Sequence, residues 1–337
     1  MNKLSKLGVS ALCGSLAAIS AANAGELTAT GSAGVTWMSL DDAVTGNPIG
    51  MVSAVSFSGS GELDNGWGVA LSIAGDDKGA FSNTAVTITL PGVGDLRIDQ
   101  GVSGTGIQRL DDVTPTVWEE ADGAGLSAGI NKISGVSAGT NLEFTAGDIA
   151  PAGTTIRLAY SKDADSGQAN DKATSGDSGA MGAGWDLTAS VTDEFHGIAG
   201  LEIYGGYSSV EQFQNEATWN GDKEETVIGI KYAMGGFTVG YQLTDEETGR
   251  TGVTNYENTS YGITFSVNDD LSIGYNHVES DGDGTSAADP EADSLQASYT
   301  MGGATFSIAE VKVDNQSYQS TAAFDTEATI VKLGLAF

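Results

Sequence analysis

The segment ATIVKLGLAF, residues 328–337, alternates apolar side chains with other side chains up to the last residue of the sequence. A period of two is typical of a β-strand whose two faces meet different surroundings. The apolar face of this strand would carry Val331, Leu333, Leu335 and Phe337. An unpaired strand edge is unfavourable, so we expect this strand to close a sheet by pairing with the first strand, at 27–37.

The same alternation recurs along the whole chain and predicts an all-β fold of about sixteen strands. The predicted strands are 27–37, 50–60, 67–75, 83–90, 94–101, 141–148, 155–161, 185–193, 199–207, 224–233, 236–244, 256–267, 270–279, 292–300, 303–312 and 326–337.

The connections between these strands are alternately short and long. The short ones are 62–66, 91–94, 150–153, 193–197, 234–236, 268–270 and 301–303. The others extend from eight residues at 75–82 to about forty at 102–140. Short turns at one rim and long loops at the other are typical of a transmembrane antiparallel β-barrel in an outer membrane.

The N-terminus predicts a signal peptide over residues 1–24, and the barrel would then occupy 25–337. Lys3 and Lys6 precede an apolar stretch at 7–22, and Ala22-Asn23-Ala24 has the small-x-small pattern of a cleavage site. The one cysteine of the chain, Cys13, would be removed with this peptide. We therefore expect an exported protein without disulfides.

The composition is strongly acidic and excludes several classes of function. There are 45 acidic and 14 basic residues, and the net charge is −31. Nucleic acid is an improbable partner for such a chain. The two histidines lie far apart in the predicted topology, and no nucleotide or nucleophile motif is present, so no enzyme and no metal centre are predicted. Calcium could bind the acidic external loops, although simple solvation explains their carboxylates better.

Taken together, the signal peptide, the sixteen strands, the very long third external loop and the terminal Phe337 resemble the general diffusion porins of Gram-negative bacteria. The acidic, glycine-rich composition is most similar to that of alphaproteobacterial porins. The resemblance implies a homotrimer in the outer membrane, in contact with its lipid and assembled by the barrel-assembly machinery through the C-terminal strand. It also implies that the third loop, 102–140, folds into the barrel and narrows the pore.

Candidate pore residues follow from this resemblance and from the alternation along the strands. The loop carries Asp111, Asp112, Glu119, Glu120 and Asp122. The resemblance implies that such acids face basic residues on the wall. The alternation places Arg97, Arg157, Lys231 and Lys332 on the lumen face. A lipid-facing charge at mid-depth would cost about 2–4 kcal/mol. The acids could instead be solvated outside, and the cations could pair locally with Asp95, Asp99 or Glu143, while Arg109 could tie the loop to the wall.

The function expected is a water-filled channel for passive diffusion of ions and small hydrophilic solutes, with a preference for cations. A substrate-selective porin for sugars or organic acids is the first alternative. The tyrosines fall mostly at outward or rim positions, which argues against an aromatic sugar path. An adhesin on a barrel is a further alternative, which the moderate loop lengths disfavour.

Overall fold

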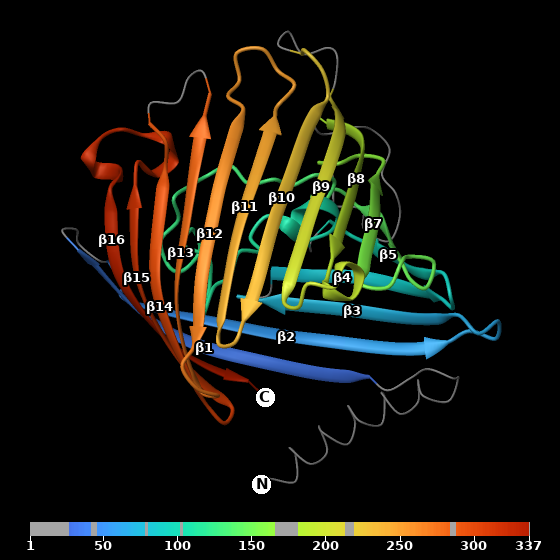
Figure 1. Cartoon of the computed structure of the whole chain (residues 1–337), viewed down its shortest axis with the longest axis horizontal. Coiled ribbons are helices and arrows are strands. Elements are labelled where there is room, and N and C mark those ends of the chain that lie inside the picture. The colour runs from blue at the N-terminus through green and yellow to red at the C-terminus, as the bar shows by residue number, and fades with distance from the viewer. Residues whose placement is uncertain are drawn as a thin grey trace, which may run out of the picture.

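The computed structural model describes residues 27–41, 46–77, 80–101, 104–165, 181–212, 219–283 and 288–336, without the side chains of 80 and 81. The predicted signal peptide and Phe337 lie outside the described residues. The described chain forms a closed antiparallel barrel of sixteen strands (Figure 1). This confirms the predicted fold class.

The strands are β1 (Thr28–Asp41), β2 (Ile49–Glu62), β3 (Gly68–Asp76), β4 (Ala80–Leu90), β5 (Gly94–Asp99), β6 (Asn141–Ala146), β7 (Thr154–Ser161), β8 (Met181–Val191), β9 (Leu201–Gln212), β10 (Lys223–Met234), β11 (Phe237–Glu247), β12 (Tyr256–Ser266), β13 (Leu271–Gly282), β14 (Glu291–Met301), β15 (Ala304–Asp314) and β16 (Thr326–Ala336). The helical turns are η1 (Gly106–Leu110), α2 (Asp193–His196), η2 (Gln316–Tyr318) and η3 (Ala322–Phe324). None of the helices in these ranges is long and apolar enough to cross a membrane.

The last strand closes the barrel on the first strand. β16 pairs antiparallel with β1 from Ala336 opposite Ser32 to Glu327 opposite Asp41. Each of the other strands pairs with its sequence neighbours. The sheet therefore has no free edge along this seam, and backbone N–H and C=O groups on both terminal strands have partners, as a hydrocarbon environment requires.

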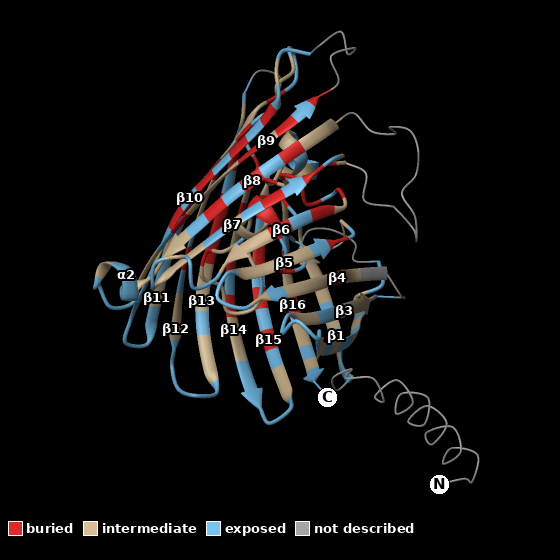
Figure 2. Cartoon of the chain, turned by 90° about the vertical axis from the view of Figure 1, so that its right-hand side faces the viewer, coloured by how far each residue is buried: buried red, intermediate tan, exposed pale blue. Residues whose placement is uncertain are grey.

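The two faces of the strands differ as the alternation predicts. On β16, Leu333 and Leu335 point outward and are 44% and 45% exposed, whereas Ile330 points inward and is 3% exposed. Val331 lies opposite the outward-facing Trp37. Buried and exposed residues alternate along β8, β10 and β15 (Figure 2). The barrel thus presents a band of half-exposed apolar side chains to its surroundings.

The connections also follow the predicted alternation, with one difference. In Figure 1 the tight turns after β10, β12 and β14 lie at the lower ends of these strands, whereas the longer connections after β11 and β15 lie at the upper ends. The predicted eight-residue connection at 75–82 is shorter, however, because β3 and β4 continue to Asp76 and Ala80. A register shift between Ala74 and Gly75 lets the two strands remain paired through this glycine-containing stretch.

We predict that Leu333→Lys destabilises the barrel in lipid vesicles. The substitution places a cation on the lipid face, where it costs about 2–4 kcal/mol at mid-depth. The free energy of unfolding in urea measures the loss. Thr305→Lys is the matched control, because Thr305 lines the lumen beside Phe306, the β15 partner of Leu333. Equal destabilisation by both variants would contradict the assignment of the two faces.

Candidate constriction site

The long connection between β5 and β6 lies inside the barrel. Its described residues, 104–140, hydrogen-bond to or pack against inward-facing side chains of strands from β6 to β16. In Figure 1 it is the teal-to-green trace that passes behind β10–β13. The connection is the third on its rim in chain order, after those between β1 and β2 and between β3 and β4, as the sequence predicts. We refer to residues 104–140 as the inner loop.

Three wall carboxylates bind backbone N–H groups of the inner loop. They are Glu143 on β6, Asp186 on β8 and Glu225 on β10, which are 2%, 0% and 1% exposed. The contacts are Gly106 N to Glu143 at 2.7 Å, Ile107 N and Val136 N to Asp186 at 3.0 and 3.2 Å, and Ser134 N and Gly135 N to Glu225 at 2.9 and 2.6 Å. Apart from η1 the inner loop has little regular structure, so its buried donors need such partners.

Wall amides bind the part of the inner loop that runs along β12–β14. Asn276 accepts from Ala121 N at 2.7 Å, and Gln296 accepts from Trp118 N at 2.9 Å. Asn258 donates to the carbonyl of Asn131 at 2.8 Å. These three residues were not predicted from the sequence. Each is an amide at an inward-facing position of a strand, and an amide at such a position is the signal that could have identified them, because a wall facing only water needs no specific hydrogen-bonding group.

An apolar cluster holds the far end of the inner loop against the wall. Ala121, Ala124 and Ala128 of the loop pack with inward-facing Val311 and Ile330, together with further residues of β13–β16. Ile330 therefore faces the inner loop rather than open water, and this contact buries apolar surface that would otherwise be exposed in the lumen.

Two glycines allow the chain to approach Asp186 closely. Gly106 and Gly135 have φ of +57° and +54°, in the left-handed region that favours glycine. A Cβ on either residue would overlap the Asp186 carboxylate. These positions therefore require glycine for two reasons, backbone conformation and space.

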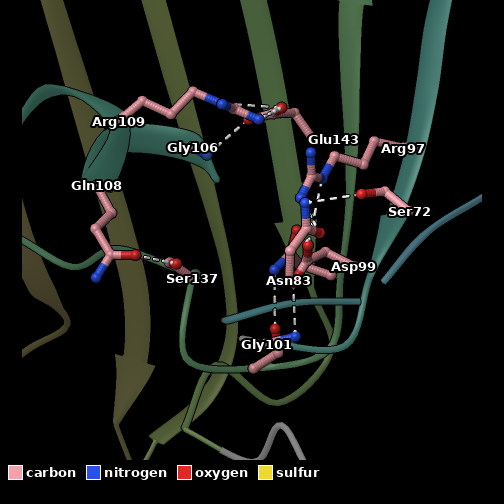
Figure 3. Close-up of polar contacts among 12 residues, drawn as sticks. Ser72, Asn83, Arg97, Asp99, Gly101, Gly106, Gln108, Arg109, Ser137 and Glu143 are labelled. Atoms are coloured by element: carbon pink, nitrogen blue, oxygen red, sulfur yellow. Dashed lines mark hydrogen bonds and ion pairs between the residues drawn. The ribbon is translucent and has the colours of Figure 1, made fainter. Parts of the chain in front are cut away.

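Arg109 ties the inner loop to the wall, which confirms that alternative. Its guanidinium binds both oxygens of Glu143, with Nη2 at 2.6 Å from Oε1 and Nε at 3.0 Å from Oε2. Figure 3 shows this pair beside the Gly106 contact, and the Gln108–Ser137 hydrogen bond that joins the two arms of the loop. A bidentate pair on a buried carboxylate fixes orientation as well as position.

Four of the five predicted acids lie close together on the inner loop, and Asp111, Asp112 and Glu120 line a cavity with residues of β11–β13. Carboxylate oxygens of Asp112, Glu119 and Glu120 lie within 4.8 Å of one another, and Asp111 hydrogen-bonds to Asp112. Burial, followed by repulsion from Asp112, raises the pKa of Asp111 to about 8. The hydrogen bond to Glu120, followed by burial, raises the pKa of Glu119 to about 7. We call these four residues the acidic cluster.

Asp122 differs from the acidic cluster. It is 9% exposed and accepts from Ala128 N at 2.6 Å. Lys132 Nζ lies 3.3 Å from Asp122 Oδ2 and 2.9 Å from Glu120 Oε1, so the ammonium group partly neutralises the charge of both carboxylates. The position of Asp122 suits a role in shaping the loop tip rather than in contacting solutes.

The predicted wall cations all point into the lumen, but their surroundings differ. Arg97 binds Asp99 at 2.8 Å and Asn83 at 3.2 Å, as Figure 3 shows. Lys231 binds Glu202 at 3.0 Å. These two cations are therefore braced locally. Asp99, the partner of Arg97, is one that the sequence suggested, whereas Glu202, the partner of Lys231, is not.

Arg157 and Lys332 form no ion pair among the described residues. Lys332 lies over the Trp118 ring, 5.5 Å from its centroid. Arg157 lines a pocket of about 360 Å³ with Arg109, Lys231 and Tyr204. The two cations lie on β7 and β16, both within the run of wall that the inner loop contacts.

The wall formed by β1–β4 contains no lysine or arginine. Its inward positions alternate with exposed apolar residues such as Trp37, Phe57 and Leu71, and they are uncharged over most of the wall, with Met38 and Leu40 among them on β1. The described part of the inner loop contacts the wall from β6 to β16, and its apolar cluster also packs against Met38 and Leu40 of β1.

We predict that Asp186→Ala loosens the inner loop. The substitution leaves the buried Ile107 and Val136 N–H groups without their acceptor, at about 1–3 kcal/mol each. The free energy of unfolding should fall by roughly 2–6 kcal/mol, and single-channel conductance should rise as the loop leaves the wall. The control is Glu310→Ala, which removes an exposed carboxylate near β16 and should change neither quantity. An unchanged conductance in Asp186→Ala would contradict the anchoring role.

Comparisons with known proteins agree with this architecture. A family model described as Gram-negative porin matches residues 8–319. Among solved structures, OmpF of Salmonella typhi in complex with daunomycin is 13% identical with a TM-score of 0.68, and covers 93% of this chain and 98% of its own. An anion-selective porin from Comamonas acidovorans is 14% identical with a TM-score of 0.65, over 93% and 99%. No curated protein sequence matches significantly.

At these identities the structural likeness shows the fold, whereas the family model covers most of the sequence. A sixteen-stranded barrel with an apolar outer band and an internal loop has the form that the family's location in the outer membrane requires. The chain therefore belongs to the Gram-negative porins, the channel-forming β-barrel proteins of the outer membrane.

Proposed function

We propose that this porin forms an open, water-filled channel for ions and small hydrophilic solutes, and that it prefers cations. The observations that carry the proposal are the acidic cluster on the inner loop and the absence of lysine and arginine from β1–β4, and we place the passage between them. A barrel of about sixteen strands is too wide for side chains to fill, so a water-filled path remains beside the inner loop. Charges at the narrowest part of such a path bias which ions enter it.

The degree of cation preference depends on how many carboxyl groups of the acidic cluster are protonated. The raised pKa values mean that Asp111 and Glu119 are partly protonated near neutral pH. Each carboxyl gains its negative charge as the pH rises through its pKa. The cluster is therefore more negative at pH 9 than at pH 6, and cation preference increases in that direction.

We predict that the potassium-to-chloride permeability ratio rises between about pH 6 and pH 9. Reversal potentials of the refolded protein in a planar bilayer, under a potassium chloride gradient at low ionic strength, measure the ratio. In the double variant Asp111→Asn, Glu119→Gln, the ratio should be lower at pH 9 and change less with pH, because the two titrating groups are gone.

The matched control is Glu247→Gln, which removes one carboxylate from an exposed position at the end of β11. Its ratio and pH dependence should equal those of the wild type. A wild-type ratio that favours chloride, or an unaltered pH dependence in the double variant, would contradict the proposed role of the acidic cluster. The absence of any conductance from folded, inserted protein would contradict the open channel itself.

A second candidate function, selectivity for small organic acids, is favoured by the surroundings of Arg157. Its guanidinium lacks an ion pair among the described residues and lines a pocket with the hydroxyl-bearing Thr155, Thr188 and Ser190. Guanidinium groups bind carboxylates through parallel hydrogen bonds. This pocket would hold an anionic solute beside a path that is otherwise acidic.

We predict that conductance in the sodium salt of a small dicarboxylic acid saturates with concentration in the wild type. Arg157→Ser should abolish the saturation, because the free guanidinium is the proposed binding group. Lys332→Gln, which removes another unpaired lumen cation away from this pocket, should retain it. Saturation that is absent in the wild type, or unchanged in Arg157→Ser, would rule out this candidate.

Assembly as a homotrimer, insertion by the barrel-assembly machinery through β16, and export by the predicted signal peptide complete the proposal. They are supported by membership of the family and by the apolar outer face of the barrel. Calcium binding by acidic external loops remains a prediction from the sequence.

A further inference from the structure

A group of metal-ligating side chains lies on the outer face of the barrel, away from the pore. His277 on β13 lies opposite Asp293 on β14, and Glu291 lies two residues along β14 toward the long connections. We propose that His277, Glu291 and Asp293 bind a first-row divalent transition metal, with Zn²⁺ as the best-suited ion.

The three donors are spaced for a common ion. His277 Nδ1 lies 2.9 Å from Asp293 Oδ1 and 3.8 Å from Glu291 Oε1. One ligand atom from each of the three residues lies within 4.8 Å of the other two. Donors bound tetrahedrally at 2.0–2.2 Å from Zn²⁺ are separated by about 3.4 Å. Small side-chain adjustments therefore suffice for coordination.

The imidazole is already held in the orientation that binding needs. Its ring stacks on Tyr261 of β12 with centroids 4.6 Å apart and planes 25° apart. The side chain is 8% exposed, and Nδ1 points at the carboxylates. The Tyr275 hydroxyl donates to Asp293, and so positions the second ligand. Such supporting contacts lower the cost of organising a metal site.

The surrounding charge favours a cation. Glu291 lies directly opposite Glu279 on β13 and Asp314 on β15, so three carboxylates are adjacent across three strands. Like charges in directly opposed positions are destabilising. Lys312, opposite Asp293, is the one basic group on these strands at this level, and it forms an ion pair with Asp314. A divalent ion would relieve the repulsion that Lys312 leaves uncompensated.

The donor set identifies the class of metal. One imidazole with two carboxylates suits Zn²⁺ and its first-row neighbours, whereas calcium and magnesium prefer oxygen donors alone. Glu291 is 44% exposed, so a fourth position can be taken by water, as in zinc sites with three protein ligands. The acidic cluster in the lumen offers no imidazole, which distinguishes the two places chemically.

The test is a titration of full-length, refolded protein in detergent with Zn²⁺, followed by calorimetry and by competition with a fluorescent zinc chelator. We expect one tight site per chain. Affinity should fall more than roughly tenfold in His277→Ala and in Glu291→Gln, because even groups that only support a metal ligand contribute about that much. With Co²⁺ in place of Zn²⁺, the wild type should show visible absorption bands that His277→Ala lacks.

Two controls separate this site from other acceptors. His196→Ala removes the other histidine of the chain and should leave binding unchanged. Asp112→Asn with Glu119→Gln disrupts the acidic cluster and should also leave it unchanged. Glu291→Gln substitutes an exposed side chain, so a folding defect cannot account for its loss of affinity. No tight binding to the wild type, or equal affinity in His277→Ala, would overturn the proposal.

Discussion

Within a lipid bilayer every backbone N–H and C=O group needs a partner from the protein itself, and the rest of this structure depends on that constraint. The pairing of β16 with β1 meets it by removing the free edge of the sheet. Closure then assigns each strand residue to one of two faces. Leu333 and Leu335 meet lipid, whereas Arg157 and Lys332 reach the lumen. The need to satisfy backbone hydrogen bonds therefore determines which charged side chains line the channel.

The same requirement operates inside the barrel, where the inner loop lies against the wall with little regular structure of its own. Buried carboxylates of Glu143, Asp186 and Glu225 accept its N–H groups, and Arg109 adds a bidentate bond. Much of the acidity on the wall is thus engaged in holding the loop. In the proposed channel, the acidic cluster is the group that an ion in the passage would meet, at a position set by these anchors.

Alternation along the sequence predicted the strands well, because alternate residues of a strand point to opposite faces of the sheet and the two faces of this sheet have different surroundings. It also predicted that Arg97, Arg157, Lys231 and Lys332 face inward. The connection between β3 and β4 was predicted too long, since Gly75 and Asp76 look like turn residues although a register shift keeps them paired. The anchors could not be predicted. Ala121 meets Asn276, 155 positions away, and Asp122 differs from its neighbour Glu120 through folding of the loop tip alone.

The wall of β1–β4 has one more consequence. Inward residues such as Thr36, Ser56, Ser72 and Thr87 carry hydroxyl groups, which rotate and can act as donor or acceptor. The inner loop, in contrast, presents carboxylates in fixed positions. In the proposed passage, a solute with separated partial charges would cross with a defined orientation, its positive end toward the loop and its other end solvated by hydroxyl groups that can donate or accept hydrogen bonds. The channel would align dipolar molecules during their passage, and solutes of equal size could differ in their rates of passage through the arrangement of their charges alone.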